Sequence, residues 1–136
     1  MGYQTDVKIG GPIPLPASSG LAGVAATAAG RGVLWDAANA VLELAGDDDR
    51  VDFIVEEVDA DTNTAHVIPF TADRQFRVRL SGTPGTLAKG KLVKISASGL
   101  FMLGGTASDV NVASCESPST ANAAALVRPL PATITS

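Results

Sequence analysis

Cysteine and histidine are almost missing from this chain of 136 residues, which contains only Cys115 and His66. A single cysteine cannot form a disulfide within the chain, so a disulfide-stapled extracellular scaffold is excluded. A zinc site needs about four ligands from His, Cys or carboxylate groups at suitable spacing, and a single His with a single Cys argues against one. We therefore expect neither a metal nor another cofactor.

Aromatic residues and long apolar segments are also scarce. Aromatics make up 4% of the chain although 46% of its residues are hydrophobic, which predicts a thin core of Val, Leu and Ile with few Phe. No segment approaches the roughly 18 apolar residues that a membrane helix needs. The apolar stretch 21–29 is short and follows three prolines, unlike a signal peptide. We expect a soluble protein that is made in a cytoplasm and binds no membrane.

Catalytic motifs are lacking as well. The chain has no Gly-x-Ser-x-Gly elbow, although a Ser-His-Asp or Cys-His site needs only one histidine. His66 lies within the expected strand 65–68, where a histidine with ordinary strand hydrogen bonding is the better interpretation. We therefore predict that the protein is not an enzyme.

Two segments resemble ligand-binding loops only in part. Residues 85–91 match the phosphate-binding loop up to its lysine, but Leu92 follows where Ser or Thr is required, and a strand is expected in place of a helix. Residues 59–63 begin like a calcium loop, but its sixth position is Thr64 and its twelfth is Phe70. A hairpin turn explains the second segment better.

Turns and alternating strands dominate what the chain does contain. Glycine (14 residues) and proline (8 residues) punctuate it often, and between them apolar and polar residues alternate with a period of two, which predicts β-strands. The clearest strand is 75–80, and the one helix candidate is 21–29. Further strands are expected at 40–45, 51–55, 65–68, 91–96, 100–103, 110–115 and 123–128. We predict a mostly β fold, a single small β-barrel or β-sandwich.

A faint internal repeat accompanies this pattern. The segment 31–69 aligns with 90–128 without a gap, and seven aligned positions are identical, among them Gly46 with Gly105 and Val51 with Val110. The turn at 59–63 then falls on the turn at 118–122, as a duplicated supersecondary unit requires. We expect two similar β halves within one domain, 21–136, joined by the strand 75–80.

Residues 1–20 are expected to form an extended N-terminal arm. Proline at every second position from Pro12 to Pro16 excludes a helix or a central strand, because proline lacks the N–H that either would use. An extended segment of this kind can lie across the surface of another protein. The candidate partner-binding residues of the arm are Pro12, Ile13, Pro14, Leu15 and Pro16.

Charge is segregated along the chain, whose net charge is −4. Residues 36–61 contain ten acids and one base, whereas 74–94 contain six bases and no acid. The simpler interpretation is that the acidic and basic segments form two solvated faces. The alternative is that acidic surface of one molecule packs against basic surface of another in an assembly. In such an assembly we expect Arg77 and Arg79 to bind the partner. The basic segment has no recognisable nucleic-acid-binding motif and the protein is acidic overall, so we expect no nucleic-acid partner.

The segment 86–99 (TLAKGKLVKISASG) resembles a turn-and-strand pattern in small shell-associated proteins of tailed bacteriophages. In those proteins a Gly hairpin and a strand of the type v-x-v-a-x-x-e follow, which residues 110–116 match, as residues 123–130 match the closing strand. With both halves of the repeat counted, the resemblance covers about residues 30–130.

This resemblance implies a capsid decoration, or cement, protein. Such a protein is a non-enzymatic structural β module, often a trimer on the shell, that binds the major capsid protein lattice and stabilises it. It is made in the host cytoplasm and located on the virion surface. Its terminal arm, here residues 2–20, reaches neighbouring subunits. Deleting residues 1–16 is then expected to leave the fold intact and to weaken shell binding.

Two alternatives remain open at this point. One is another virion structural part, such as a head fibre base or a tail component. The other is a small ligand-binding barrel or enzyme that uses His66 and nearby carboxylates.

Overall fold

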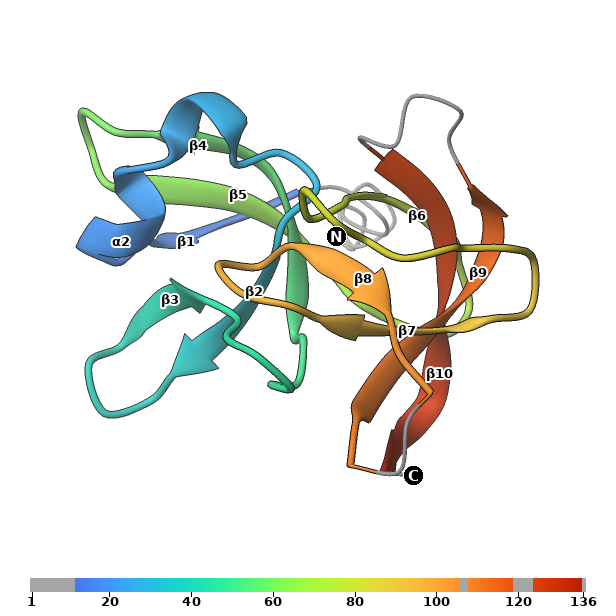
Figure 1. Cartoon of the computed structure of the whole chain (residues 1–136). Coiled ribbons are helices and arrows are strands. Elements are labelled where there is room, and N and C mark those ends of the chain that lie inside the picture. Colours follow the sequence, from blue (N-terminus) through green and yellow to red (C-terminus); the bar gives the residue numbers. More distant parts are fainter. Residues whose placement is uncertain (1–11, 106–107, 119–123, 136) are drawn as a thin grey trace, which may run out of the picture.

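The computed structural model describes residues 12–105, 108–118 and 124–135. Within these residues the chain forms two antiparallel five-stranded sheets, consistent with a β-sandwich (Figure 1). The prediction of a mostly β fold is confirmed. We call the part that holds the first sheet the first unit (residues 12–70) and the part that holds the second sheet the second unit (residues 76–135).

The first sheet has the strand order β1-β5-β4-β2-β3. Its strands are β1 (Ile13–Pro16), β2 (Gly32–Asp36), β3 (Val41–Leu44), β4 (Phe53–Asp59) and β5 (Thr64–Pro69). The second sheet has the order β6-β10-β9-β7-β8. Its strands are β6 (Phe76–Arg79), β7 (Leu92–Ile95), β8 (Phe101–Leu103), β9 (Val110–Pro118) and β10 (Ala124–Thr135).

The helix candidate at 21–29 forms two short turns, α2 (Ser19–Ala22) and the 3-10 helix η1 (Ala25–Thr27). Ser18 begins α2, because its hydroxyl accepts a hydrogen bond from the Leu21 N–H at 3.2 Å. Leu21 is fully buried and packs into the core of the first unit. These two turns cover that core at one end.

Strand pairing repeats from one sheet to the other. The pairs Gly32 with Ile54 and Val55 with Val67 recur in the second sheet as Leu92 with Ser114 and Cys115 with Val127. Even the β-bulge of β4 opposite His66 recurs at the same place in β9, opposite Leu126. Each unit also contains an isolated parallel β-bridge at the equivalent place. It joins Ala17 to Leu42 in the first unit and Leu80 to Phe101 in the second.

The gapless alignment of 31–69 with 90–128 is therefore in register only for β3 and β8. In the other aligned strands the equivalent residue lies one position further along, so that Val33 corresponds to Val93 and not to Leu92. The physical reason is a hairpin of different length: the chain between paired Val33 and Leu44 is one residue longer than that between Val93 and Leu103. A gapless alignment cannot represent such a change.

Equivalent positions build the two cores. Six buried residues of the first unit have buried counterparts at the corresponding positions of the second. They are Ala17, Val33, Leu42, Val55, Ala65 and Val67, matched by Leu80, Val93, Phe101, Cys115, Ala125 and Val127.

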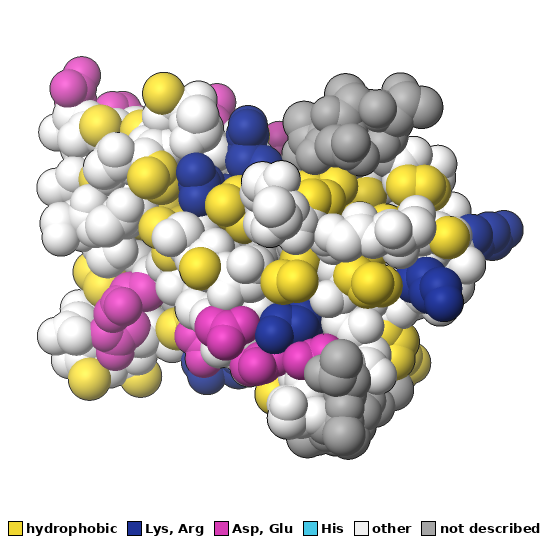
Figure 2. Space-filling model, viewed as in Figure 1, with side chains coloured by type: hydrophobic (Ala, Val, Ile, Leu, Met, Phe, Trp, Pro, Cys, Tyr) yellow, Lys and Arg dark blue, Asp and Glu magenta, His cyan; other side chains and the backbone are white. Residues whose placement is uncertain are grey.

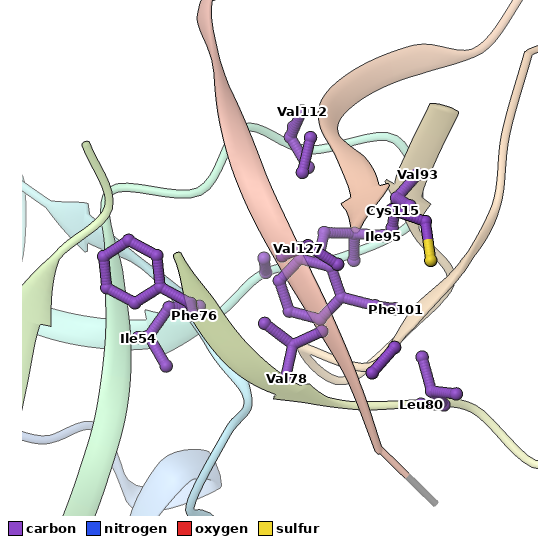
Figure 3. Close-up of a cluster of buried hydrophobic side chains, with 13 residues drawn as sticks. Ile54, Phe76, Val78, Leu80, Val93, Ile95, Phe101, Val112, Cys115 and Val127 are labelled. Atoms are coloured by element: carbon purple, nitrogen blue, oxygen red, sulfur yellow. The ribbon is translucent and has the colours of Figure 1, made fainter. Parts of the chain in front are cut away.

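The outer surface of the first unit packs against the core of the second. Ile54 lies beside Phe76 in this cluster (Figure 3), and the rings of Phe70 and Phe76 are 5.1 Å apart between centroids. The first unit contributes Leu34, Ala45, Val51, Ile54, Ile68 and Phe70 to this contact. The strand residues Leu34, Ile54 and Ile68 correspond in the second unit to Lys94, Ser114 and Arg128, all three polar. The outer surface of the second unit is therefore more polar at these positions than that of the first.

Residues 13–16 of the predicted arm belong to the folded body. They are extended as expected, but as β1 they pair with β5 from Ile13 opposite Val67 to Pro16 opposite Thr64. β1 ends the sheet order, which is where a strand with prolines is tolerated. Residues 1–11 lie outside the described residues. A deletion of 1–16 would remove a sheet strand, so the expectation that it leaves the fold intact is withdrawn.

Candidate functional site

A cleft of about 490 Å³ lies between the two units. Its apolar lining comes from both units: Ile54 and Ile68 from β4 and β5, and Phe76 and Val78 from β6. Gly30 also lines it and links β4 to β6, because its N–H donates to the Val55 carbonyl and its carbonyl accepts from the Arg79 N–H, both at 2.9 Å. The cleft therefore lies where Gly30 connects β4 and β6.

Three arginines and one carboxylate make the cleft basic. Arg74, Arg77 and Arg79 line it together with Glu56. Arg79 is held in place by its Nε–H, which donates to the Ala29 carbonyl at 3.1 Å. Within the described residues, no ion pair involves Arg74, Arg77 or Glu56. Two guanidinium groups are therefore available to an anionic group.

Strand alternation places these side chains. In β6, Phe76 and Val78 are buried in the core while Arg77 between them is exposed. β6 is also the end strand of its sheet. The Arg79 N–H points away from the neighbouring β10, toward Gly30, and because backbone groups alternate along a strand, the Arg77 N–H points to the same side. The cleft therefore borders a strand edge that, beyond the Arg79–Gly30 bond, no described strand pairs with.

A second charged cluster lies at the junction of the units and is structural. The Lys94 ammonium is within 3.1 Å of Asp47, 3.2 Å of Asp48 and 3.4 Å of Asp109, and its side chain is only 11% exposed. Burial alone would lower the pKa of Lys94, but hydrogen bonds to the three carboxylates outweigh it and raise that pKa above its usual value. Acidic side chains on the face in Figure 2 gather mainly over the first unit and near this junction.

The predicted partner-binding residues fall in two separate places. Arg77 and Arg79 line the cleft. The residues of the Pro-rich segment do not line it but form or flank β1 at the edge of the first sheet, where Pro12, Ile13, Pro14 and Pro16 are exposed and Leu15 is half-buried. Ile13 is 39% exposed, the one large hydrophobic side chain of the described residues that is so open. The equivalent residue in the second unit, Phe76, is covered by the first unit.

Sequence reasoning missed most of the cleft lining. Arg74 belongs to the same basic segment as Arg77 and Arg79, so segregation of charge was the available signal. Glu56, Ile54 and Ile68 reach the cleft only because the first unit packs against β6, and no local pattern encodes that packing.

Two further chemistry-bearing side chains, His66 and Cys115, lie on β5 and β9. His66 is half-buried, and among the described residues its Nδ1 has no hydrogen-bond partner. Cys115 is buried, and burial followed by the nearby Glu116 carboxylate raises the pKa of its thiol, which disfavours the reactive thiolate. Among the residues that the structure describes, no group of His, Cys, Asp and Glu side chains is arranged to hold a metal ion. The same residues contain no helix long and apolar enough to cross a membrane.

No protein-family model matches the chain, and no curated protein matches its sequence significantly.

Proposed function

We propose that the chain is a non-enzymatic structural protein that decorates a bacteriophage capsid and stabilises it by binding the lattice of the major capsid protein. The observation that carries the proposal is the cleft between the units, where the β6 edge, apolar side chains and two arginines without an ion pair among the described residues, Arg74 and Arg77, meet on the surface. This combination fits the capture of another protein chain. The resemblance of residues 86–99 and 110–116 to shell-associated phage proteins supplies the class of partner.

The body of the molecule suits such a role. Two units that share a core form one β structure, with the contact groups on its outer surface rather than in an enclosed pocket. Many copies on a symmetric shell would add avidity to weak individual contacts. We propose that the protein acts as a homo-oligomer, a trimer on the virion surface, after synthesis in the host cytoplasm.

Reconstitution on empty positions of the shell tests this proposal. Expanded heads from a phage that lacks this chain are mixed with the purified protein, sedimented and analysed for bound copies. We expect binding that saturates in proportion to the number of major capsid subunits, and a higher temperature of heat-induced DNA release. Heads that bind none of the protein, or that gain no stability from saturating amounts, would overturn the proposal.

The same experiment separates the virion alternatives, because a head fibre base or a tail component would bind at only a few positions per particle. The enzyme or ligand-binding alternative is favoured by one observation, the unpartnered Nδ1 of His66. Replacing His66 with Ala is expected to leave head binding unchanged. A loss of head binding in a folded His66→Ala variant would contradict the assignment of His66 as a structural strand residue.

A further inference from the structure

We propose that the edge of β6, the end strand of its sheet among the described residues, accepts an extended acidic peptide segment of a partner chain, which adds to the second sheet as a strand within the cleft between the units. The inference rests on the proposed function only for the identity of that partner. The chemistry of the segment follows from the cleft itself.

The backbone of β6 has free hydrogen-bonding groups on the side that faces the cleft, as far as the described residues show. On one side β6 pairs with β10 through the register Phe76 with Val127 to Arg79 with Ala124. On the other side the Arg79 N–H bonds to Gly30, after which the cleft begins. The Arg77 N–H and carbonyl therefore face the cleft, and an extended peptide can satisfy both of them as a neighbouring strand does.

The side chains around this edge specify what the added strand carries. Successive residues of a strand face opposite sides, so an added strand presents one set of side chains to Ile54 and Phe76 and the other set to Arg77 and Arg74. The first set must be apolar and the second set must be anionic. Opposite charges on neighbouring strands stabilise their pairing. The segment that fits alternates apolar and acidic residues.

A peptide fits these groups better than a nucleic acid. The volume of about 490 Å³ falls within the usual range of ligand clefts. A nucleic acid gains its affinity from many phosphate contacts on a broad basic face, whereas here Glu56 stands beside the arginines and the protein carries a net charge of −4. The apolar lining would also remain unused by a phosphate backbone.

The probe for this inference is the fluorescein-labelled peptide Val-Glu-Val-Glu-Val, blocked at its C-terminus and titrated with the full chain by fluorescence anisotropy. We expect saturable binding that weakens with added salt, since partly exposed ion pairs are screened. Val-Lys-Val-Lys-Val is expected not to bind. The same peptide with every internal amide N-methylated keeps its side chains and is expected to bind more weakly, because it lacks the N–H groups that strand addition uses in either pairing direction.

Charge reversal at the edge locates the binding. Arg77→Glu is expected to weaken binding of the Val-Glu peptide at least about tenfold, since it replaces an ion pair by repulsion. Lys89→Glu makes the same change of charge at an exposed residue outside the cleft and is expected to have a much smaller effect. Arg77→Gln, which removes the charge without adding repulsion, serves if Arg77→Glu does not fold.

Three results would overturn the inference. They are the absence of saturable binding, equal losses in Arg77→Glu and Lys89→Glu, and undiminished binding of the N-methylated peptide. Arg77-dependent binding of a short poly-dT strand without binding of the Val-Glu peptide would make the cleft a nucleic-acid surface instead. The titration contains no capsid, so its result is independent of the proposed function. The peptide can bind although heads are not decorated, and heads can be decorated although the peptide does not bind.

Discussion

At the scale of single residues, the junction of the two units depends on one buried cation. Lys94 comes from β7 of the second unit, whereas Asp47 and Asp48 follow β3 of the first. The Asp48 carboxylate also accepts a hydrogen bond from the Val110 N–H at 3.0 Å, which adds a second link between the units. Removing the cation would take away the counter-charge that three neighbouring carboxylates share, of which Asp109 is the most buried.

Replacing Lys94 with Met is therefore expected to lower the free energy of unfolding by about 3 kcal/mol, the lower end of the range for breaking a buried ion pair. Chemical denaturation of wild type and variant measures the difference. Lys91→Met, which removes an exposed lysine that has no ion pair within the described residues, should change stability by less than about 0.5 kcal/mol. Equal effects of the two substitutions would show that the cluster contributes nothing.

The raised pKa of Lys94 predicts that the destabilisation caused by Lys94→Met depends on pH. Because the pKa of Lys94 is raised on folding, its contribution is complete below the ordinary lysine pKa of about 10.4 and is lost as the pH rises through the higher folded value. The stability difference between wild type and Lys94→Met should stay constant from about pH 7 to about pH 9 and shrink in more alkaline buffer. A difference that grows with alkaline pH would contradict the raised pKa.

Gly99 is a second residue on which the junction depends. It has φ +74°, and a Cβ there would lie 2.5 Å from the carbonyl oxygen of Gly32. Gly99→Ala is expected to cost about 3 kcal/mol, from backbone strain and from displacement of the facing strand. Gly90 has φ +90° with nothing within 4 Å of a Cβ, so Gly90→Ala isolates the conformational part, about 1 kcal/mol. Equal losses in urea denaturation would show that close packing at Gly99 is unimportant.

At the scale of elements, local patterns predicted the strands that have one buried face. The segment 75–80 alternates because Phe76 and Val78 enter the core while Arg77 stays exposed, and β6 forms there. β2 was not predicted, because both of its faces are covered: Val33 packs into the first core and Leu34 against the second. A strand covered on both faces shows no alternation.

Pairing between distant elements accounts for what the sequence could not predict. Proline spacing indicated that residues 12–16 are extended, but not that they join the sheet beside β5. Segregation of charge indicated Arg77 and Arg79 as partner-binding candidates. It did not indicate that Glu56 would line the same cleft. Such neighbours depend on how the units pack, and no short-range pattern reports it.

Two truncations test the role of β1. Deleting residues 1–16 removes a strand that pairs with β5 at four positions, and we expect at least about 3 kcal/mol of destabilisation, because core surface of the first unit becomes exposed. Deleting residues 1–11 spares β1 and is the matched comparison, expected to be more stable than the 1–16 deletion. If both truncations melt together with the full chain, β1 does not contribute to the fold as described.

At the scale of the whole molecule, two repeated units share one continuous structure. The first unit supplies Ile54 and Ala45 to a core that is otherwise made of residues of the second unit. Neither unit can unfold without exposing part of this shared surface. The molecule should therefore unfold in a single cooperative transition.

The chain contains one reporter in each unit to test this cooperativity. Trp35, the only tryptophan, lies in β2, and Cys115, the only cysteine, is buried in β9. Tryptophan fluorescence and thiol reactivity, followed through the same urea titration, are expected to change at one midpoint. Two separate midpoints would show that the units unfold independently.

Quantitative mass spectrometry of purified virions from the source host is the decisive test of the proposed capsid decoration. We predict peptides of this chain at levels comparable to those of the major capsid protein. A few copies per particle would assign the chain to a tail or a fibre, and its complete absence from virions would contradict the proposal.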